Sequence, residues 1–498
     1  MIWAVRAAQS GNHIEAARYL EFPPEVVTDD ITSKYFLHPW LVEDCINEYL
    51  ITKMRSGDHI KRGRIMNCRS FNAVAAIFNA LKAVQNELSG LQQGKINILD
   101  ELIRIGNKQF EWQRGFTNNA LFYRTSYIFG GGRCSSYFEE KNGLSFDEFT
   151  MFGFGLWTHF VSNPIIRAPV NAREIGLSDE KSKLASRILC KSIGELKNEA
   201  KLLKATCWFG EYGPSVLRKY PCISLGNDES GQFHAPIPEL VAHRVTHGMY
   251  YDVITGGRVV REEIGERFES YCLELLRASV PQARYFGASK YFRTRAQQVE
   301  TPDIRVKADS NVLLVIECKA NRLNVDSKFN PEKLSSPDGM DALVKGVTQL
   351  WYYFRDVRLG RIPGDQVSPE ALGMILTLDP WLQMANTRYD TILKSAREAV
   401  EETSGDFIDD DFRAVAFCEV SDFESLVRKC DLDSLVGTIR IATRKERAGW
   451  LLASIHSELY PAARTGPFVF ESNMPNVVRW WNRFDCVEPK TTHAERTD

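Results

Sequence analysis

The sequence predicts an α+β protein of several domains, with a mostly α-helical N-terminal half followed by a mixed central sheet flanked by helices. Three observations lead to this expectation. A chain of 498 residues exceeds what one hydrophobic core usually accommodates, which indicates two to four domains. Residues 1–250 carry apolar side chains mostly at helical spacing. After residue 255, short β-branched runs alternate with helical patterns, as in a sheet covered by helices.

Residues 1–250 are expected to form a helical recognition or regulatory region. Residues 70–91 are rich in Ala and Leu at helical spacing, and Ser145 and Ser192 each precede a Glu by three residues, the pattern of a capping box. Residues 212–238, with their Gly, Pro, Asn and Asp, are interpreted as a loop. This half would also supply the surface for a protein partner or for a homodimer.

The segment 259–279 is expected to be an amphipathic helix, because Phe268 and its apolar neighbours recur at helical spacing. Glu269 lies at the edge of the apolar stripe, where it either faces a site or is one more solvated glutamate. Gly265 costs a helix about 1 kcal/mol relative to Ala, which suggests that another element packs closely against it.

The next two apolar segments predict a β-hairpin. Residues 303–306 alternate polar and apolar side chains, residues 311–316 are mostly β-branched or aliphatic, and a turn-forming stretch separates them. Pro302 suits the start of a strand, where no hydrogen-bond donor is required. Such a hairpin returns Glu317 to a position next to Asp303.

The end of this hairpin carries two carboxylates and an amine. Side chains alternate along a strand, so Glu317 and Lys319 share a face while Cys318 points to the other. Two carboxylates repel unless a cation lies between them, and hard oxygen ligands favour Mg²⁺ or Mn²⁺ over zinc. Lys319 would orient or deprotonate a water and offset charge on a phosphate. The pattern predicts phosphodiester hydrolysis; a surface Asp and an exposed Glu-x-Lys pair are the alternative.

A second helix is expected at residues 341–357. It places Gln349 and Tyr353 one turn apart, where they either hydrogen-bond a phosphate and steady the catalytic groups or belong to the helix surface and core. Two further strands, 372–378 and 414–420, with a helix between them at 389–402, complete the predicted sheet.

In this order the elements resemble the PD-(D/E)xK nuclease superfamily, which has the restriction-endonuclease-like fold. The Gly-x-x-Phe-Glu segment that ends at Glu269 is similar to a helix of the Mrr-like and Holliday-junction-resolvase-like branches, and the Gln349-x-x-x-Tyr353 helix is similar to that of the RecB-like branch. The resemblance covers residues 255–440, for which it implies a restriction-endonuclease-like α/β domain.

The resemblance implies roles for individual residues. Asp303 and Glu317 would bind Mg²⁺ or Mn²⁺, with the backbone carbonyl of Cys318 as a further ligand. Lys319 would handle the nucleophilic water, and Glu269 would hold a second metal or a metal-bound water. The implied activity is that of a Mg²⁺-dependent endonuclease acting on DNA, in defence against foreign DNA or in repair. The alternative is a catalytically silent or partner-gated nucleic-acid-binding or sensor protein that retains the fold.

A local cluster of basic residues could bind the phosphates of a DNA backbone, although the whole chain has a net charge of only -2. Basic residues cluster around the predicted hairpin, and such side chains make most contacts to phosphates. Arg293 and Arg295 are therefore predicted to bind substrate, and an ordinary mixed-charge surface is the alternative. The side chains expected to follow the phosphates are Arg293, Arg295, Arg305, Lys307, Arg322 and Lys328.

Residues 441–498 are expected to form a C-terminal helical extension packed on the body. This segment contains Trp450, Trp480 and Trp481 among several arginines, and docking of a terminal helix is favoured over stacking on bases. No stretch of the sequence is apolar for long enough to predict a membrane span.

Cysteine and histidine usage excludes several site types. The 11 cysteines contain no Cys-x-x-Cys pair, which argues against a disulfide framework and a zinc ribbon and favours a reducing cytoplasm. His243 and His247 share a helical face but lack the Glu of a His-Glu-x-x-His zinc motif. The triple glycine at residues 130–132 lacks the Lys-Ser/Thr of a phosphate loop, so ATP binding is not expected.

Overall fold

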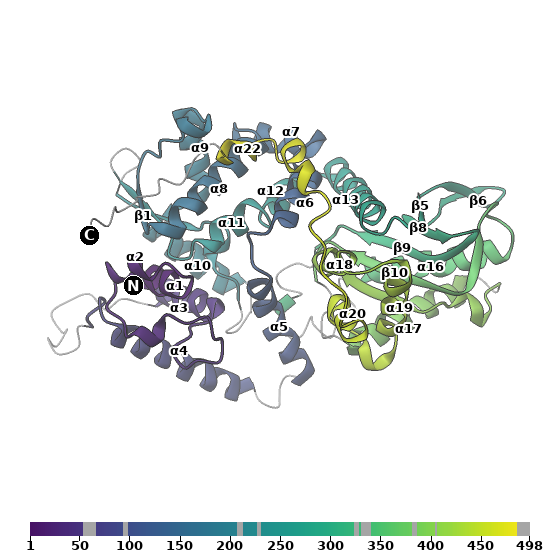
Figure 1. The fold of residues 1–498 in the computed structure, drawn as a ribbon, viewed down its shortest axis with the longest axis horizontal. Helices are drawn as coiled ribbons and strands as arrows, with labels where there is room; N and C mark the ends of the chain where they lie inside the picture. The colour runs from purple at the N-terminus through teal and green to yellow at the C-terminus, as the bar shows by residue number, and fades with distance from the viewer. Residues whose placement is uncertain are drawn as a thin grey trace, which may run out of the picture.

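The computed structural model describes residues 1–52, 66–92, 98–206, 213–226, 231–322, 328–329, 340–380, 386–403 and 406–485. Within these ranges the chain is α+β with mixed sheets, as the sequence predicts. Figure 1 shows the helices of the first half on one side and the largest sheet on the other, with α5 (Ile98–Arg114) between them.

Helices dominate the first half. They are α1 (Ile2–Gln9), α2 (His13–Ala17), α3 (Pro39–Ile51), α4 (Phe71–Gln92), α5, α6 (Asn119–Phe129), α7 (Gly132–Asn142), α8 (Phe146–Ser162), α9 (Asp179–Leu189), α10 (Ile193–Thr206), α11 (Glu239–Val245) and α12 (Met249–Val253). Both predicted capping boxes form: Ser145 exchanges hydrogen bonds with Glu148 at the start of α8, and Ser192 does so with Glu195 at the start of α10.

A small four-stranded sheet interrupts these helices, and the sequence did not predict it. Its order is β1 (Ile165–Arg167), β4 (Gln232–His234), β3 (Cys222–Leu225) and β2 (Cys190–Ser192). The expected loop at residues 212–238 therefore contains two strands. Strands of three or four residues carry no readable alternation, and they form because distant residues such as Ile165 and His234 pair.

The largest sheet has five strands in the order β11 (Val415–Glu419), β10 (Gln366–Thr377), β9 (Asn311–Lys319), β8 (Ile304–Ala308) and β5 (Arg284–Gly287). Strands β5, β8 and β9 are antiparallel, whereas β9, β10 and β11 run parallel, so the sheet is mixed. A separate hairpin, β6 (Lys290–Thr294) and β7 (Gln297–Glu300), projects at the far right of Figure 1.

Helices cover both faces of this sheet. Val315 and Ile375 pack in one core with α16 (Asp341–Arg358) and α17 (Asn386–Thr403). Leu314 and Ile316 point to the other face and share a core with α13 (Arg258–Ser279), α18 (Val420–Val427) and α19 (Leu432–Ala442). This alternation along β9 is that of a strand buried on both faces.

The core on the α13 face continues into the N-terminal half. Tyr271 of α13 is fully buried, and its ring lies 5.6 Å from that of Tyr127 on α6. The Tyr271 hydroxyl donates a 2.5 Å hydrogen bond to Glu424 of α18, which also receives Arg124 of α6. The helical half and the sheet are therefore joined through α13.

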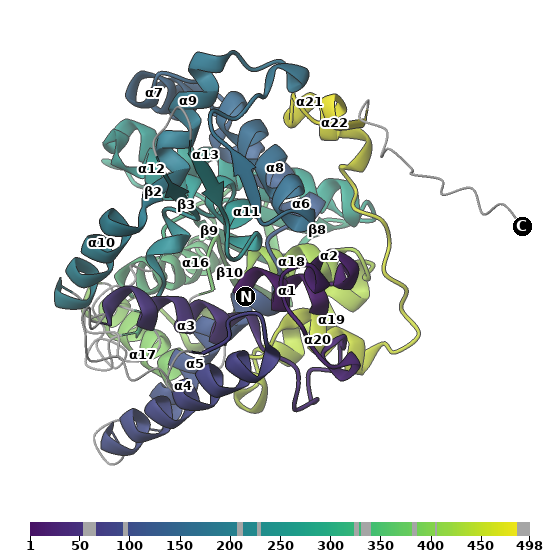
Figure 2. The ribbon, with the colours of Figure 1, turned by 90° about the vertical axis from the view of Figure 1, so that its left-hand side faces the viewer.

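The C-terminal segment returns from the sheet to the first half. Figure 2 shows it running from α20 (Leu452–Leu459) across the molecule to α21 (Met474–Val477) and α22 (Asn482–Asp485). Trp480 is buried, and its indole N–H donates to the Thr150 hydroxyl of α8 at 2.9 Å. The tail thus docks an aromatic side chain against α8. In the described ranges no helix combines the length and the apolarity that a bilayer crossing requires.

Candidate active site

The predicted hairpin exists and brings its two ends together. Strands β8 and β9 pair antiparallel with Ile304 opposite Ile316, and the turn between them includes Asp309 at a φ of 51°. Asp303, directly before β8, accepts a 2.6 Å hydrogen bond at Oδ2 from the backbone N–H of Cys318. The Asp303 carboxylate is thereby held beside the end of β9, where Glu317 and Lys319 lie.

Glu317 and Lys319 lie on the sheet face that α16 covers. The Lys319 amine donates to Glu317 Oε1 at 2.8 Å and to Gln349 Oε1 of α16 at 3.1 Å. The Cys318 side chain is on the other face, against Cys272 of α13. Gln349 is therefore brought to the site, as one of the two sequence interpretations expected.

Gly346 allows α16 to approach this cluster, and the sequence did not single it out. A Cβ at Gly346 would lie 3.0 Å from Lys319 Cε and 2.9 Å from Ile375 Cδ1. At Gly265 of α13 a Cβ would meet nothing nearer than Glu269 Oε1 at 3.9 Å, so the predicted close packing there is wrong. In the sequence, the only indication of close packing at either position was that Gly destabilises a helix. That cost is the same at Gly346 and Gly265, so it could not distinguish them.

Three carboxyl groups at this end of the sheet interact with one another. Burial and then the charge of Glu317 raise the pKa of Glu269 to about 7. Burial and the charges of Glu317 and Glu269 raise the pKa of Asp303 well above its usual range. Burial also raises the pKa of Glu317, although Lys319 opposes the shift. The charge of Glu269 on α13 therefore acts on the carboxyl groups of the hairpin.

The donor set fits a hard divalent cation. Glu317 Oε2 is buried and has no hydrogen-bond partner among the described residues, and a cation would compensate the charges of Asp303 and Glu317. In the described ranges no group of three or more His, Cys, Asp and Glu side chains is arranged to hold a metal. Mg²⁺ needs only one or two carboxylates because it keeps several waters, so Asp303 and Glu317 suffice for Mg²⁺.

Tyr353 is not brought to the carboxylates. It lies one turn beyond Gln349 on α16, is buried, and donates a 2.7 Å hydrogen bond to Asp365 Oδ2. Asp365 also receives Arg305 at 2.8 Å and Lys307. Tyr353 belongs to an internal network under the middle of the hairpin, which matches the interpretation of this residue as part of the helix core.

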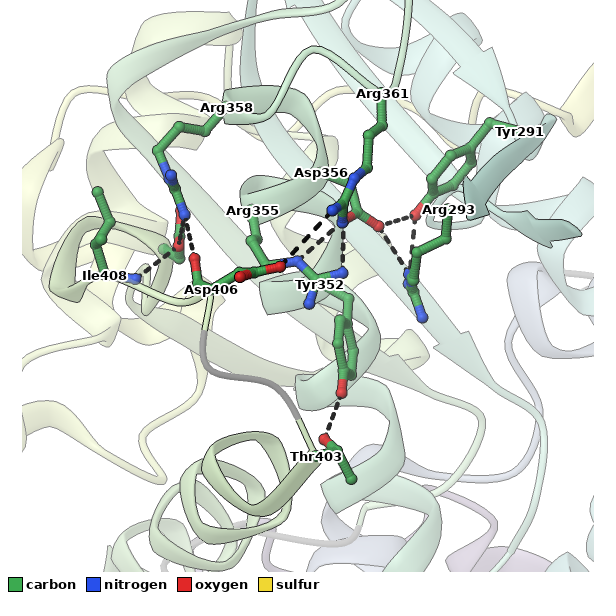
Figure 3. Close-up of polar contacts among 11 residues, drawn as sticks. Tyr291, Arg293, Tyr352, Arg355, Asp356, Arg358, Arg361, Thr403, Asp406 and Ile408 are labelled. Atoms are coloured by element: carbon green, nitrogen blue, oxygen red, sulfur yellow. Dashed lines mark hydrogen bonds and ion pairs between the residues drawn. The ribbon is translucent and has the colours of Figure 1, made fainter. Parts of the chain in front are cut away.

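Arg293 and Arg295 differ in their surroundings. Arg293 Nε donates to the buried Asp356 at 2.8 Å, and its guanidinium lies over the ring of Tyr352 (Figure 3). Asp356 is fully buried, and a buried carboxylate needs a positive charge beside it, which the ion pair with Arg293 provides. Arg295 is exposed in the turn between β6 and β7. Of the two, only Arg295 presents its charge to solvent.

The other basic side chains expected to follow phosphates are engaged inside the protein. Arg305 and Lys307 pair with Asp365, and Lys328 pairs with Asp379 at 2.6 Å. Arg322 donates to the backbone carbonyl of His247 at 2.9 Å. The sequence did not indicate these pairs, because Asp365 lies 60 and 58 residues from Arg305 and Lys307 and belongs to no recognisable motif. Only the folded chain brings Asp365 and Asp379 near their partners.

Comparisons of the chain with protein-family models, with curated proteins and with solved structures find no match. The chemistry of the site is therefore inferred from its geometry. Buried carboxylates at Asp303 and Glu317, an amine at Lys319 and a carboxyl with a pKa near 7 at Glu269 form a set that can bind a divalent cation and move a proton.

Proposed function

We propose that this protein is a metal-dependent endonuclease that hydrolyses phosphodiester bonds of DNA. The observation that carries the proposal is the meeting of Asp303, Glu317 and Lys319 at one end of the β8–β9 hairpin. Glu317 Oε2 is buried there, and no residue that the structure describes forms a hydrogen bond with it. A buried carboxylate oxygen without a partner is costly, and a bound cation would remove that cost.

The order of elements supports a restriction-endonuclease-like fold for the sheet region. Helix α13 precedes the antiparallel pair β8 and β9, and α16 then connects β9 to the parallel strand β10. This arrangement places α13 and α16 on opposite faces while both contribute a side chain, Glu269 and Gln349, to the same end of β9.

Each side chain has a distinct part in the proposed reaction. Asp303 and Glu317 would hold Mg²⁺ or Mn²⁺, which when bound supplies Lewis-acid stabilisation of the attacked phosphate. Lys319 orients the attacking water and offsets charge on the phosphate, and Gln349 keeps the amine in place through its 3.1 Å bond. Glu269, with a pKa near 7, accepts the proton of that water at neutral pH.

A second candidate is a nuclease that acts only when a partner or effector is bound. It is favoured by the internal pairing of Arg293, Arg305 and Lys307, which leaves few of the predicted phosphate contacts available. The ion pair between Lys319 and Glu317 also favours it. This pair would have to break or shift before Glu317 binds a metal and Lys319 contacts a phosphate.

The test is cleavage of linear, circular and single-stranded DNA and of RNA by the purified chain with Mg²⁺, Mn²⁺ or EDTA. Asp303→Asn and Lys319→Met are compared with the wild type. We expect metal-dependent cutting of DNA that both variants lose. If wild type and variants behave alike on every substrate, the proposal fails for the isolated chain. Cutting that appears only after addition of a cell extract supports the partner-gated candidate.

A further inference from the structure

A cavity lies between the helical half and the carboxyl ends of two parallel strands. Its volume is about 620 Å³, a size that suits small-molecule ligands. The walls come from α5, α10, α11 and α12, together with Arg322, three residues after β9, and Asp379, two residues after β10. Ligands of open α/β sheets commonly bind outside the carboxyl ends of the strands.

Two imidazoles line this cavity with a free ring nitrogen each. The rings of His243 and His247 stack at 5.4 Å with an angle of 9° between their planes. Nδ1 of each is buried and has no hydrogen-bond partner within the described part of the chain, and the same holds for Nε of Arg322. Buried polar groups are normally paired, so three such atoms along one cavity point to a ligand that supplies acceptors.

The charge of the lining favours an anion. Six cations and four carboxylates line the cavity: Lys141, Arg218, Lys219, Arg244, Arg322 and Lys328 against Glu111, Glu199, Asp252 and Asp379. Salt bridges join Arg218 to Glu111, Arg244 to Asp252 and Lys328 to Asp379. Among the residues that the structure describes, none forms an ion pair with Lys141, Lys219 or Arg322, so positive charge remains in excess over Glu199.

A metal ion does not fit this cavity. Burial and the nearby Arg218 lower the pKa of His243 to about 3, and burial, His243 and Arg322 lower that of His247 well below its usual range. Both imidazoles are therefore neutral, but the adjacent guanidinium groups would repel a divalent cation. In the described ranges no three-ligand group of His, Cys, Asp and Glu includes them. An oxyanion, in contrast, would be attracted by the same charges.

The cavity also offers an aromatic surface. Tyr251 lines it with 46% of its surface exposed, and Tyr220 contributes a second ring that carries Lys219 over its face. Half-exposed aromatic rings stack readily with nucleobases. We propose that this cavity binds a nucleoside phosphate, with its phosphate toward His243, His247 and Arg322 and its base against Tyr251.

Isothermal titration calorimetry of the full chain without divalent metal tests the proposal. The titrants are AMP, CMP, GMP and UMP, the four uncharged nucleosides and inorganic phosphate. We expect at least one nucleotide to bind about tenfold or more tightly than its nucleoside and than phosphate, since both parts contribute contacts. Nucleotide binding is measured independently of nuclease activity. The nuclease proposal can therefore fail while the cavity still binds a nucleotide, and the cavity proposal can fail while the protein still cleaves DNA.

Substitutions of cavity-lining residues, compared with one outside the cavity, test whether nucleotide binding occurs there. His243→Gln with His247→Gln, and Arg322→Gln alone, should weaken nucleotide binding about tenfold or more. Lys141→Ala with Lys219→Ala changes only exposed side chains, so folding is retained, and it should weaken binding and reduce its salt dependence. His234→Gln is the matched control, because His234 bonds the Pro164 carbonyl and does not line the cavity.

Four outcomes would overturn the assignment. The first three are that no nucleotide binds, that inorganic phosphate binds as tightly as every nucleotide, or that the histidine, Arg322 and lysine variants all bind like the wild type. A short DNA duplex that displaces the nucleotide would also overturn it, because the cavity would then be part of the path of the nucleic acid.

Discussion

Lys319 and Gln349 are joined by a 3.1 Å hydrogen bond from the amine to Oε1, although they lie 30 residues apart on different elements. Because the same amine also contacts Glu317 at 2.8 Å, α16 and β9 together determine where the positive charge of the site lies. The proposed chemistry therefore depends on helix packing as well as on the hairpin, and the variants below separate the two.

Removing the amine should abolish most DNA cleavage while leaving the fold intact. Lys319→Met keeps the length of the side chain but cannot orient water, and we expect a loss of about 100-fold to 10,000-fold in the rate. Rates on a DNA substrate with Mg²⁺ provide the measurement. Lys345→Met, on α16, is the control and should cut at the wild-type rate. Equal rates for the two variants would exclude Lys319 from the reaction.

Gln349 and Tyr353 should differ sharply despite their helical spacing. Gln349→Ala removes the partner of Lys319 and should lower the cleavage rate about tenfold, an effect of roughly 1.4 kcal/mol. Tyr353→Phe removes one hydrogen bond to Asp365 and should cost about 1 kcal/mol of stability without changing the rate. Thermal unfolding and rates are measured on both. A rate defect in Tyr353→Phe that exceeds that of Gln349→Ala would contradict the geometry.

Two glycines provide a matched pair for the packing of the site. Gly346→Ala introduces a Cβ 3.0 Å from Lys319 Cε, so the Lys319 side chain must give way by a few tenths of an ångström, and we expect the rate to fall about 10-fold to 100-fold. Gly265→Ala meets open space and should stabilise α13 by up to about 1 kcal/mol with an unchanged rate. Cleavage rates and unfolding midpoints of both variants are measured, and a reduced rate for Gly265→Ala would be inconsistent with the open space found there.

The stability of the metal-free protein should fall as the pH rises. Folding raises the pKa values of Glu269, Asp303 and Glu317, so the folded state holds protons that the unfolded state releases. Their contribution is complete below pH 4.5 and is lost as the pH rises through about 7. Melting temperatures in EDTA between about pH 5 and pH 8 should therefore decline, and less steeply in Glu269→Gln.

The control for this pH dependence is Glu262→Gln, an exposed side chain on the same helix that forms only a surface ion pair with Arg258. It should follow the wild-type curve. Mg²⁺ should raise the melting temperature more at pH 8 than at pH 6, because ionised carboxylates bind it. An equal Mg²⁺ effect at both pH values would mean that the Asp303 and Glu317 carboxylates do not hold the ion.

Residues 255–440 should not fold when expressed alone. Excision would remove Arg124 of α6 from the buried Glu424, and breaking a buried ion pair costs about 3–5 kcal/mol. It would also expose Tyr271 and the face of α13 that packs on α6. Circular dichroism and thermal unfolding of the excised fragment are the measurement. A cooperative transition like that of the full chain would show that the sheet region is an independent domain.

Long elements with clear periodicity were predictable. The helix expected at 259–279 is α13 (Arg258–Ser279), and that expected at 341–357 is α16 (Asp341–Arg358). The strand expected at 372–378 is longer, because β10 (Gln366–Thr377) continues through an irregularity in its pairing with β9. The short strands β1 to β4 were not predicted, since each is defined by partners distant in the sequence and not by its own pattern.

The sequence by itself determined the face alternation that puts Glu317 and Lys319 together, because side-chain direction along a strand follows from local geometry. Only the tertiary structure decided that Gln349 reaches Lys319 while Tyr353 turns to Asp365, and that Gly346 is the point of close approach. These relations depend on how α16 lies across β9. Helix packing of this kind is set by the summed contacts of a whole core, which no single motif encodes.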